Sequence, residues 1–325
     1  MKQETFKTII DAFLEARDKN GELLKMDAII VSDASNMFSH YFNARSSPND
    51  IRSLSKTILA MSIGKAIADG VMLRGEKLSL DTKLWRYLEG KVPLYNKNNE
   101  ERIKRITLRH ALTHTIGFEI GLMFSKDIEG KDHSKLLEYI INTDLLFEPG
   151  EHFVYSNAGP YLVSAIIQEE LGCDLASWVG RTLLEALDIR DFSWKKYGSY
   201  SAGSSGLSLR IEDLHRIARL FVSGGEWQGR SVVPKVWLDE MTKPAVRTPT
   251  MFDEKRVFPK YAYGIGLWIC EDGRYYVDGT DGQYIIVLPR SQTVVTTFGH
   301  QADMKPITEC LRPLLASELK HEPLS

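Results

Sequence analysis

The spacing of a serine and a lysine indicates a nucleophile with its own base. Side chains three residues apart on a helix share a face, so a lysine amine can accept the proton of a serine three positions before it. The sequence holds four such pairs, which are Ser53–Lys56, Ser62–Lys65, Ser193–Lys196 and Ser317–Lys320. This spacing is common at random, so the setting of each pair decides its interpretation.

Ser53 has the setting that best suits a nucleophile. It begins a predicted helix, where unpaired backbone N–H groups and the positive end of the helix dipole favour a developing anion. Ser62 lies on the opposite face of that helix, Ser193 lies in a basic turn, and Ser317 is near the end of the last predicted helix. We therefore predict Ser53 as the nucleophile and Lys56 as its base.

A tyrosine and an asparagine supply a second candidate group. Tyr155 and Asn157 follow a turn-forming stretch and come directly before a predicted helix. A phenol near an ammonium group can shuttle protons, and an amide two residues later can bind a substrate carbonyl. The alternative is a half-buried aromatic ring beside a helix-capping asparagine. A second Tyr-x-Asn, at Tyr41 and Asn43, lies in a predicted strand where alternate packing accounts for it.

Two other catalytic motifs do not occur, and a third is incomplete. The sequence has neither the Gly-x-Ser-x-Gly of an α/β-hydrolase elbow nor the glycine-rich phosphate-binding P-loop. His110 and His114 have the spacing of a zinc protease motif, but Ala111 stands where the glutamate is required. We interpret both as hydrogen-bonded histidines at a helix end, and we predict neither a metal nor a cofactor.

Hydrophobic periodicity predicts strands near both ends of the chain and helices between them. Strands are predicted at 27–32, 37–42, 263–270, 274–277, 283–288 and 293–298. Helices are predicted near 6–14, 53–71, 106–113, 134–142, 159–170, 177–187, 211–222, 234–241 and 305–319. This order indicates an α/β (α+β) protein with one antiparallel sheet built from both termini. We expect residues 1–52 and 203–325 to form the sheet domain and residues 53–202 to form a mainly helical domain.

Composition narrows the class of protein. The chain has 325 residues, 43% of them hydrophobic, and its formal net charge of −2 is unlike the basic excess of most nucleic-acid-binding proteins. No apolar run is long enough to cross a membrane, and the first residues lack the apolar core of a secretory signal. Three scattered cysteines argue against a disulfide scaffold. We expect a cytoplasmic protein with no nucleic-acid or membrane partner.

The order of several short motifs resembles the serine hydrolases related to class C β-lactamases and penicillin-binding proteins. In chain order the motifs are 53–57 (SLSKT), 68–70 (ADG), 78–81 (LSLD), 108–117 (LRHALTHTIG), 149–157 (PGEHFVYSN) and 203–208 (GSSGLS). The resemblance implies a β-lactamase/transpeptidase-like fold with the site between the sheet and the helical domain. It further implies that Ser53 is acylated and that Lys56 is its general base. By the same resemblance, Tyr155 relays a proton to the leaving group and Asn157 contacts the substrate.

The third motif of that family departs from the usual pattern. The family has Lys or His, then Thr or Ser, then Gly, and the matching stretch here is 277–279 (VDG). Val277 therefore replaces a cation that often binds a substrate carboxylate, and Arg274 or His300 is a candidate for the missing charge. The Gly-x-x-Gly-Gln of residues 279–283 is similar to the 6-aminohexanoate-dimer hydrolases.

The resemblance also implies an oxyanion hole and a function. The hole would be formed by the backbone N–H groups of Ser53 and Thr280, and substrate contacts fall on Asn157, Gly279, Thr280 and Gln283. The leading hypothesis is a serine hydrolase that cleaves a small-molecule ester or amide through an acyl-enzyme. One alternative is a non-catalytic binding or sensor protein that is acylated without turnover. A second alternative is a scaffold that uses the fold for protein contacts.

Overall fold

A large antiparallel sheet forms one end of the molecule. The computed structural model describes residues 1–43, 47–248 and 261–314. The sheet has eight strands in the order β12-β13-β14-β15-β16-β17-β1-β2, so strands from the two ends of the chain meet where β17 pairs with β1. The predicted sheet built from both termini is therefore confirmed. The strands are β1 Met26–Ser32, β2 Met37–Tyr41, β12 Val246–Arg247, β13 Ala262–Tyr263, β14 Trp268–Ile269, β15 Tyr275–Gly279, β16 Gln283–Leu288 and β17 Thr293–Gly299.

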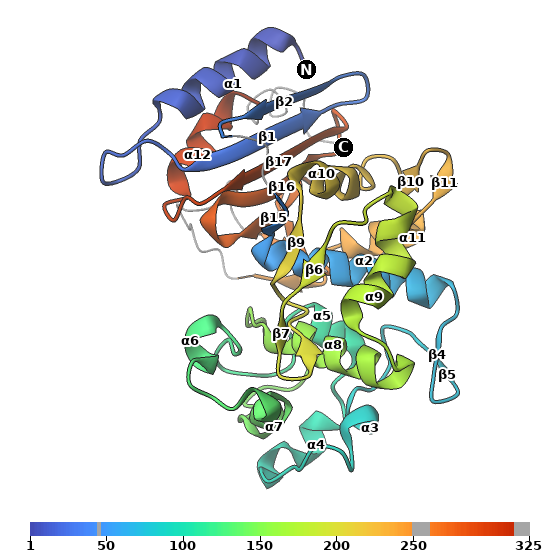
Figure 1. The fold of residues 1–325 in the computed structure, drawn as a ribbon. Helices are drawn as coiled ribbons and strands as arrows, with labels where there is room; N and C mark the ends of the chain where they lie inside the picture. The colour runs from blue at the N-terminus through green and yellow to red at the C-terminus, as the bar shows by residue number, and fades with distance from the viewer. Residues whose placement is uncertain (44–46, 249–260, 315–325) are drawn as a thin grey trace.

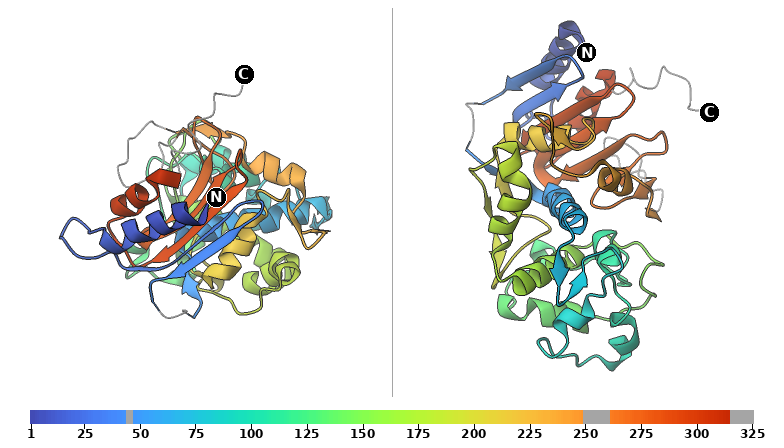
Figure 2. Two further views of the ribbon diagram at one scale, coloured as in Figure 1. Left: turned by 90° about the horizontal axis from the view of Figure 1, so that it is seen from above. Right: turned by 90° about the vertical axis from the view of Figure 1, so that its right-hand side faces the viewer.

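Helices cover both faces of this sheet (Figure 1). Successive side chains of a strand point to opposite faces, and every residue of β16 is buried, so both of its faces are covered. On one face, α1 (Gln3–Glu15) and α12 (Lys305–Cys310) lie side by side, as Figure 2 also shows. On the other face lie α10 (Ile211–Arg219) and α2 (Ser55–Ala68).

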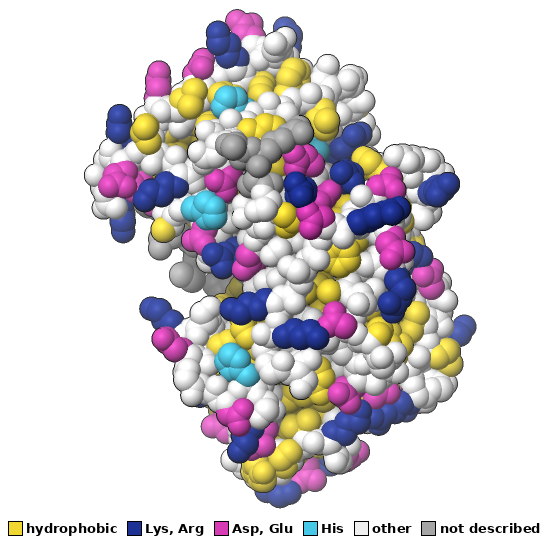
Figure 3. Space-filling view, viewed as in Figure 1, with side chains coloured by type: hydrophobic (Ala, Val, Ile, Leu, Met, Phe, Trp, Pro, Cys, Tyr) yellow, Lys and Arg dark blue, Asp and Glu magenta, His cyan; other side chains and the backbone are white. Residues whose placement is uncertain are grey.

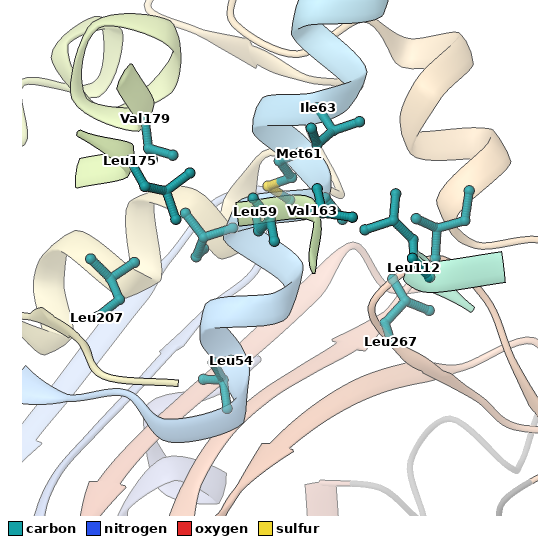
Figure 4. Packing of buried hydrophobic residues seen from close by; sticks show 14 of the residues in the cluster. Leu54, Leu59, Met61, Ile63, Leu112, Val163, Leu175, Val179, Leu207 and Leu267 are labelled. Carbon is teal, nitrogen blue, oxygen red and sulfur yellow. The ribbon is translucent and has the colours of Figure 1, made fainter. Parts of the chain in front are cut away.

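Helix α2 is the central element that joins the sheet to the helical part. Its side chains are buried on nearly every side from Ser55 to Gly64, the polar ones included. Figure 4 shows Leu59, Met61 and Ile63 of α2 surrounded by side chains from other segments. The remaining α-helices are α3 Trp85–Leu88, α4 Glu100–Ile103, α5 Leu108–Leu112, α6 Ser125–Ile128, α7 Leu136–Asn142, α8 Ala158–Leu171, α9 Leu175–Val179 and α11 Lys235–Met241. Because the first turns of α2 are buried on all sides, they give a firm base for the residues at its start.

Short strand pairs hold the loops in place. A small sheet of order β3-β9-β6 brings residues 49–50 beside residues 207–209. Residues 49–50 come shortly before α2 in the sequence. The short strands are β3 Asn49–Asp50, β4 Met72–Leu73, β5 Glu76–Lys77, β6 Ser193–Trp194, β7 Lys196–Tyr197, β8 Tyr200–Ser201, β9 Leu207–Leu209, β10 Glu226–Trp227 and β11 Arg230–Ser231.

Several predicted elements differ in the structure. The helix predicted over 177–187 is α9 followed by a π-helical segment, Gly180–Leu184, and a 3-10 turn, Glu185–Leu187. The strand predicted over 263–270 is two short strands, β13 and β14, because a tight turn interrupts it. In that turn the Gly264 N–H donates to the Leu267 carbonyl at 3.0 Å, and Gly266 has a φ of +76°, which suits glycine. The last helix is assigned over Lys305–Cys310. Residues 312–314 are helical as well. The remaining part of the predicted range, 315–319, and the Ser317–Lys320 pair lie outside the described residues.

Charged side chains of both signs are intermingled over the face shown in Figure 3. Within residues 1–43, 47–248 and 261–314, no helix combines the length and apolarity that a membrane crossing requires.

Candidate active site

The structure brings Ser53 and Lys56 together at the start of α2. Ser53 lies in a 3-10 turn, Arg52–Leu54, that leads into the helix. The Lys56 Nζ donates to the Ser53 Oγ at 3.1 Å and to the Ser204 carbonyl at 3.0 Å. The turn is held by Ser55, whose Oγ donates to the Arg52 carbonyl at 2.7 Å. The amine is therefore within proton-transfer distance of the hydroxyl.

Burial gives Lys56 the acid–base property that a general base needs. The residue is 3% exposed, and burial lowers the pKa of its ammonium group to about 7, against a weaker opposing effect of the Asp278 carboxylate. An ordinary lysine is almost fully protonated at neutral pH, whereas this one is neutral in about half of the molecules. The neutral amine can accept the Ser53 proton.

Tyr155 lies over the lysine and is fixed by other aromatic rings. The Lys56 Nζ is 4.9 Å from the centre of the Tyr155 ring. That ring stacks on Trp268 at 5.5 Å between centroids and contacts His114 at 4.5 Å. Packing on both sides fixes the orientation of the phenol beside the serine–lysine pair.

His114 is a residue of this site that sequence reasoning missed. The Ser156 N–H donates to its Nδ1 at 3.3 Å, and its Nε2 lies 3.2 Å from the Tyr263 hydroxyl. Burial and the charge of Lys56 hold the pKa of His114 well below its ordinary value, so the ring is neutral with its proton on Nε2. The i, i+4 histidine spacing singled out His114 only as a hydrogen-bonded residue at a helix end, and these two hydrogen bonds confirm that interpretation. Among the described residues, no group of three or more His, Cys, Asp or Glu side chains could hold a metal ion.

A cavity of about 320 Å³ opens beside the serine. Three of the four predicted substrate contacts, Asn157, Gly279 and Thr280, line it together with Ser53 and Tyr155. The Asn157 Nδ2 donates to the Met123 carbonyl at 3.1 Å, while its Oδ1 is buried without a hydrogen-bond partner in the described part of the chain. The remaining lining residues are Asp50, Arg52, Phe124, Ser125, Lys195, Tyr197, Ser205, Gly206, Asp278 and Met304.

Gln283 does not line this cavity. Its side chain is 3% exposed and exchanges two hydrogen bonds of 3.0 Å with the backbone of Gly299. The amide therefore joins β16 to β17, and we no longer assign it a substrate contact.

The third motif is also corrected by the structure. Val277, which matched the position of the family cation, is buried in the core between the sheet and α2. The next side chain, Asp278, lines the cavity and accepts a 2.8 Å hydrogen bond from the Trp268 Nε1. Neither proposed replacement cation lines the cavity, because Arg274 pairs with Asp272 and His300 pairs with Asp27. The third motif therefore places the Asp278 carboxylate in the cavity, whereas the family pattern has a Lys or His cation in this motif.

The competing motifs have structural partners elsewhere. The Ser62 Oγ donates to the Ile58 carbonyl at 3.0 Å within α2, and Lys65 pairs with Asp69 at 2.7 Å. The Tyr41 hydroxyl donates to Glu212 at 2.6 Å.

The fold and this arrangement define a class of protein. An antiparallel sheet packed on a helical part, with a serine–lysine pair at the start of the central helix and a tyrosine over the lysine, is the β-lactamase/transpeptidase-like architecture. The Beta-lactamase family model matches residues 10–308, so the chain belongs to the beta-lactamase family.

A curated relative matches part of the chain. Part of the chain is 29% identical over 158 residues to a Dichelobacter nodosus protein described as "Probable fimbrial assembly protein FimD, serogroup H1". The match covers 46% of this chain and 36% of the relative, so the chain spans well under half of that protein.

Two solved structures share the fold over almost the whole chain. EstCE1, described as a hydrolase with promiscuous acyltransferase activity, superposes with a TM-score of 0.73 at 15% identity, covering 95% of this chain and 97% of its own. A provisionally assigned 6-aminohexanoate-dimer hydrolase from Bacillus anthracis gives a TM-score of 0.70 at 18% identity, and the match covers 90% of this chain and 79% of that structure.

Proposed function

We propose that this protein is a serine hydrolase that cleaves an ester or amide bond through an acyl-enzyme on Ser53. The observation that carries the proposal is the Lys56 amine, 3.1 Å from the Ser53 Oγ and with its pKa lowered by burial to about 7. Family membership and the hydrolase descriptions of structural neighbours support hydrolysis as the reaction class.

The proposed reaction has two halves. In the first, neutral Lys56 takes the Ser53 proton as the Oγ attacks the substrate carbonyl carbon, and the backbone N–H groups of Ser53 and Thr280 hold the oxyanion. The carbonyl re-forms and the bond to the leaving group breaks. Tyr155 donates its phenolic proton to that group and takes the proton that Lys56 received, so both side chains return to their starting states. In the second, water attacks the acyl ester in the same way, which releases the acid and restores the Ser53 hydroxyl.

Asp278 supports a preference among substrates. Its carboxylate lines the cavity beside Gly279 and Thr280, so a substrate carboxylate placed there would meet a like charge. This disfavours substrates that need a cation at the third motif, and it favours esters or amides without a carboxylate at that point.

Intact-protein mass spectrometry with p-nitrophenyl butyrate tests the proposal. A transient mass increase of one butyryl group, with continuing release of nitrophenolate, is the expected result. A butyryl adduct that persists without further release would contradict turnover and support the sensor alternative. A complete absence of adduct and of nitrophenolate would contradict both and favour the scaffold alternative.

The pH dependence gives a separate prediction. Because only neutral Lys56 is a base, kcat/KM for this ester should rise with pH through a midpoint near 7. The Asp278 carboxylate stabilises the ammonium form and thereby raises this pKa, so Asp278→Asn should move the midpoint to lower pH. Asp69→Asn, which removes the same charge from a side chain that is 53% exposed just after α2, should leave the midpoint in place. A midpoint that stays or rises in Asp278→Asn would contradict this role of Lys56.

A further inference from the structure

Two backbone turns of unusual conformation meet at the cavity. Arg52, directly before Ser53, has a φ of +55°, and Asp281, directly after Thr280, has a φ of +69°. Residues other than glycine rarely adopt this left-handed backbone conformation, and each such residue costs on the order of 1 kcal/mol or more. Arg52 is next in sequence to Ser53, and Asp281 is next to Thr280. The backbone N–H groups of Ser53 and Thr280 are the two that we propose bind the oxyanion.

We propose that the Arg52–Asp281 ion pair is a clamp that sets the separation of the Ser53 and Thr280 N–H groups. The Arg52 Nη2 donates to the Asp281 Oδ2 at 2.9 Å and so links the turn before α2 to the turn between β15 and β16. The inference rests on the proposed function, because it concerns the oxyanion hole of that reaction. Both residues are positioning residues that act through the neighbouring backbone.

The turn that carries Ser53 is held from its other side by Asp50. The Asp50 Oδ1 accepts the Arg52 N–H at 2.7 Å and the Gly206 N–H at 3.1 Å, and its Oδ2 pairs with the Arg52 Nη1 at 3.1 Å. The guanidinium of Arg52 therefore lies between two carboxylates, Asp50 on its own turn and Asp281 on the other. Arg52 thus bridges the two carboxylates, with Nη1 bonded to Asp50 and Nη2 to Asp281, which suits the planar, forked donors of arginine.

The turn that carries Thr280 is also anchored, apart from the clamp. The Gln301 N–H donates to the Asp281 carbonyl at 3.0 Å, which ties this turn to the end of β17. The two turns touch closely at Gly279, where a Cβ would lie 2.8 Å from the Arg52 Cβ. Across the described chain, no other side-chain hydrogen bond joins residues 51–54 to residues 279–283. The ion pair therefore acts together with the packing at Gly279 and with the buried side chains of Ile51 and Leu54 to set the relative position of the two N–H groups.

The expected effect of the clamp is on rate more than on stability. The Arg52 and Asp281 side chains are 41% and 31% exposed, and ion pairs this accessible contribute about 0–1 kcal/mol to folding. Loss of one oxyanion donor costs about 10²- to 10³-fold in rate, so a partial misplacement should cost about tenfold. Neither residue is among the groups that shift the pKa of Lys56, so the pH midpoint should not move.

Asp281→Asn tests the clamp with little disturbance, because asparagine tolerates a positive φ. We expect the single-turnover acylation rate with p-nitrophenyl butyrate to fall about tenfold, with an unchanged pH midpoint and a melting temperature within about 3 °C of wild type. The control is Asp69→Asn, which breaks the 2.7 Å Lys65–Asp69 pair on α2 away from the cavity and should keep the wild-type acylation rate.

A double-mutant cycle separates the clamp from a general structural effect. If the two side chains act through each other, Asp281→Asn should cost little further rate in an Arg52→Gln background. A wild-type acylation rate in Asp281→Asn, or an equal tenfold loss in the Arg52→Gln background, would overturn the clamp while leaving the hydrolase proposal in place. Failure of the wild-type protein to form any adduct would instead overturn the proposed function, and the clamp with it.

Discussion

Ser53→Ala is expected to reduce turnover of p-nitrophenyl butyrate by about 10⁴- to 10⁶-fold and to abolish the butyryl adduct. Alanine has no oxygen to attack the carbonyl, so the covalent intermediate cannot form. Any remaining hydrolysis would come from water attacking a carbonyl held in the oxyanion hole. Initial rates of nitrophenolate release and intact-protein mass measure the two effects.

Ser62→Ala is the matched control for this experiment. It removes a serine hydroxyl from the same helix, also three residues before a lysine, where the Oγ only donates to the Ile58 carbonyl. We expect normal adduct formation and a turnover rate within about twofold of wild type, because Ser62 is not among the described residues that line the cavity. If Ser53→Ala keeps its adduct, another residue is the nucleophile and the proposed reaction is wrong.

Lys56→Met is expected to lower kcat/KM for the same ester by about 10²- to 10⁴-fold, the usual contribution of a general base. Methionine fills the buried space with a similar straight chain but cannot accept the Ser53 proton. The loss should be largest above pH 7, where the wild-type amine is neutral and active. A variant that keeps the wild-type pH profile would show that a different group is the base.

The same substitution should increase stability at low pH. The pKa of Lys56 falls from 10.5 in the unfolded chain to about 7 in the folded protein. Between these values the unfolded chain binds the extra proton, so wild-type stability rises with pH over this window. Below pH 7 the folded protein holds a buried charge, which costs on the order of 4 kcal/mol.

Lys56→Met removes that cost, although it also leaves the Ser204 carbonyl without its 3.0 Å hydrogen bond, which costs about 1–3 kcal/mol. We therefore expect the variant to be more stable than wild type by about 1–3 kcal/mol at pH 6, with the advantage gone by pH 10. Denaturant unfolding of both proteins at pH 6 and at pH 10 measures this difference in the free energy of unfolding. Lys65→Met, at a lysine paired with Asp69 on the surface of α2, should show no comparable dependence on pH.

Local features of the chain were readable from the sequence. The hairpin of β1 and β2 follows from two short apolar runs around a polar turn, and β16 was predicted with the bounds that the structure shows. The contact between Ser53 and Lys56 was also predictable, because helical geometry alone places residues three apart on one face. The family motifs then pointed to Tyr155, which no local rule would join to that pair.

Tertiary packing decided the properties that make these residues a site. Whether Val277 or Asp278 faces the cavity depends on which face of β15 packs on the core beneath α2, and alternation along a strand allows either register. Gln283 was misassigned because its partner, Gly299, is on a neighbouring strand. The lowered pKa of Lys56 and the neutral state of His114 arise from burial by segments distant in sequence. The sequence by itself determined which groups could react, whereas desolvation and strand register, which exist only in the folded chain, decided which of them meet and in what protonation state.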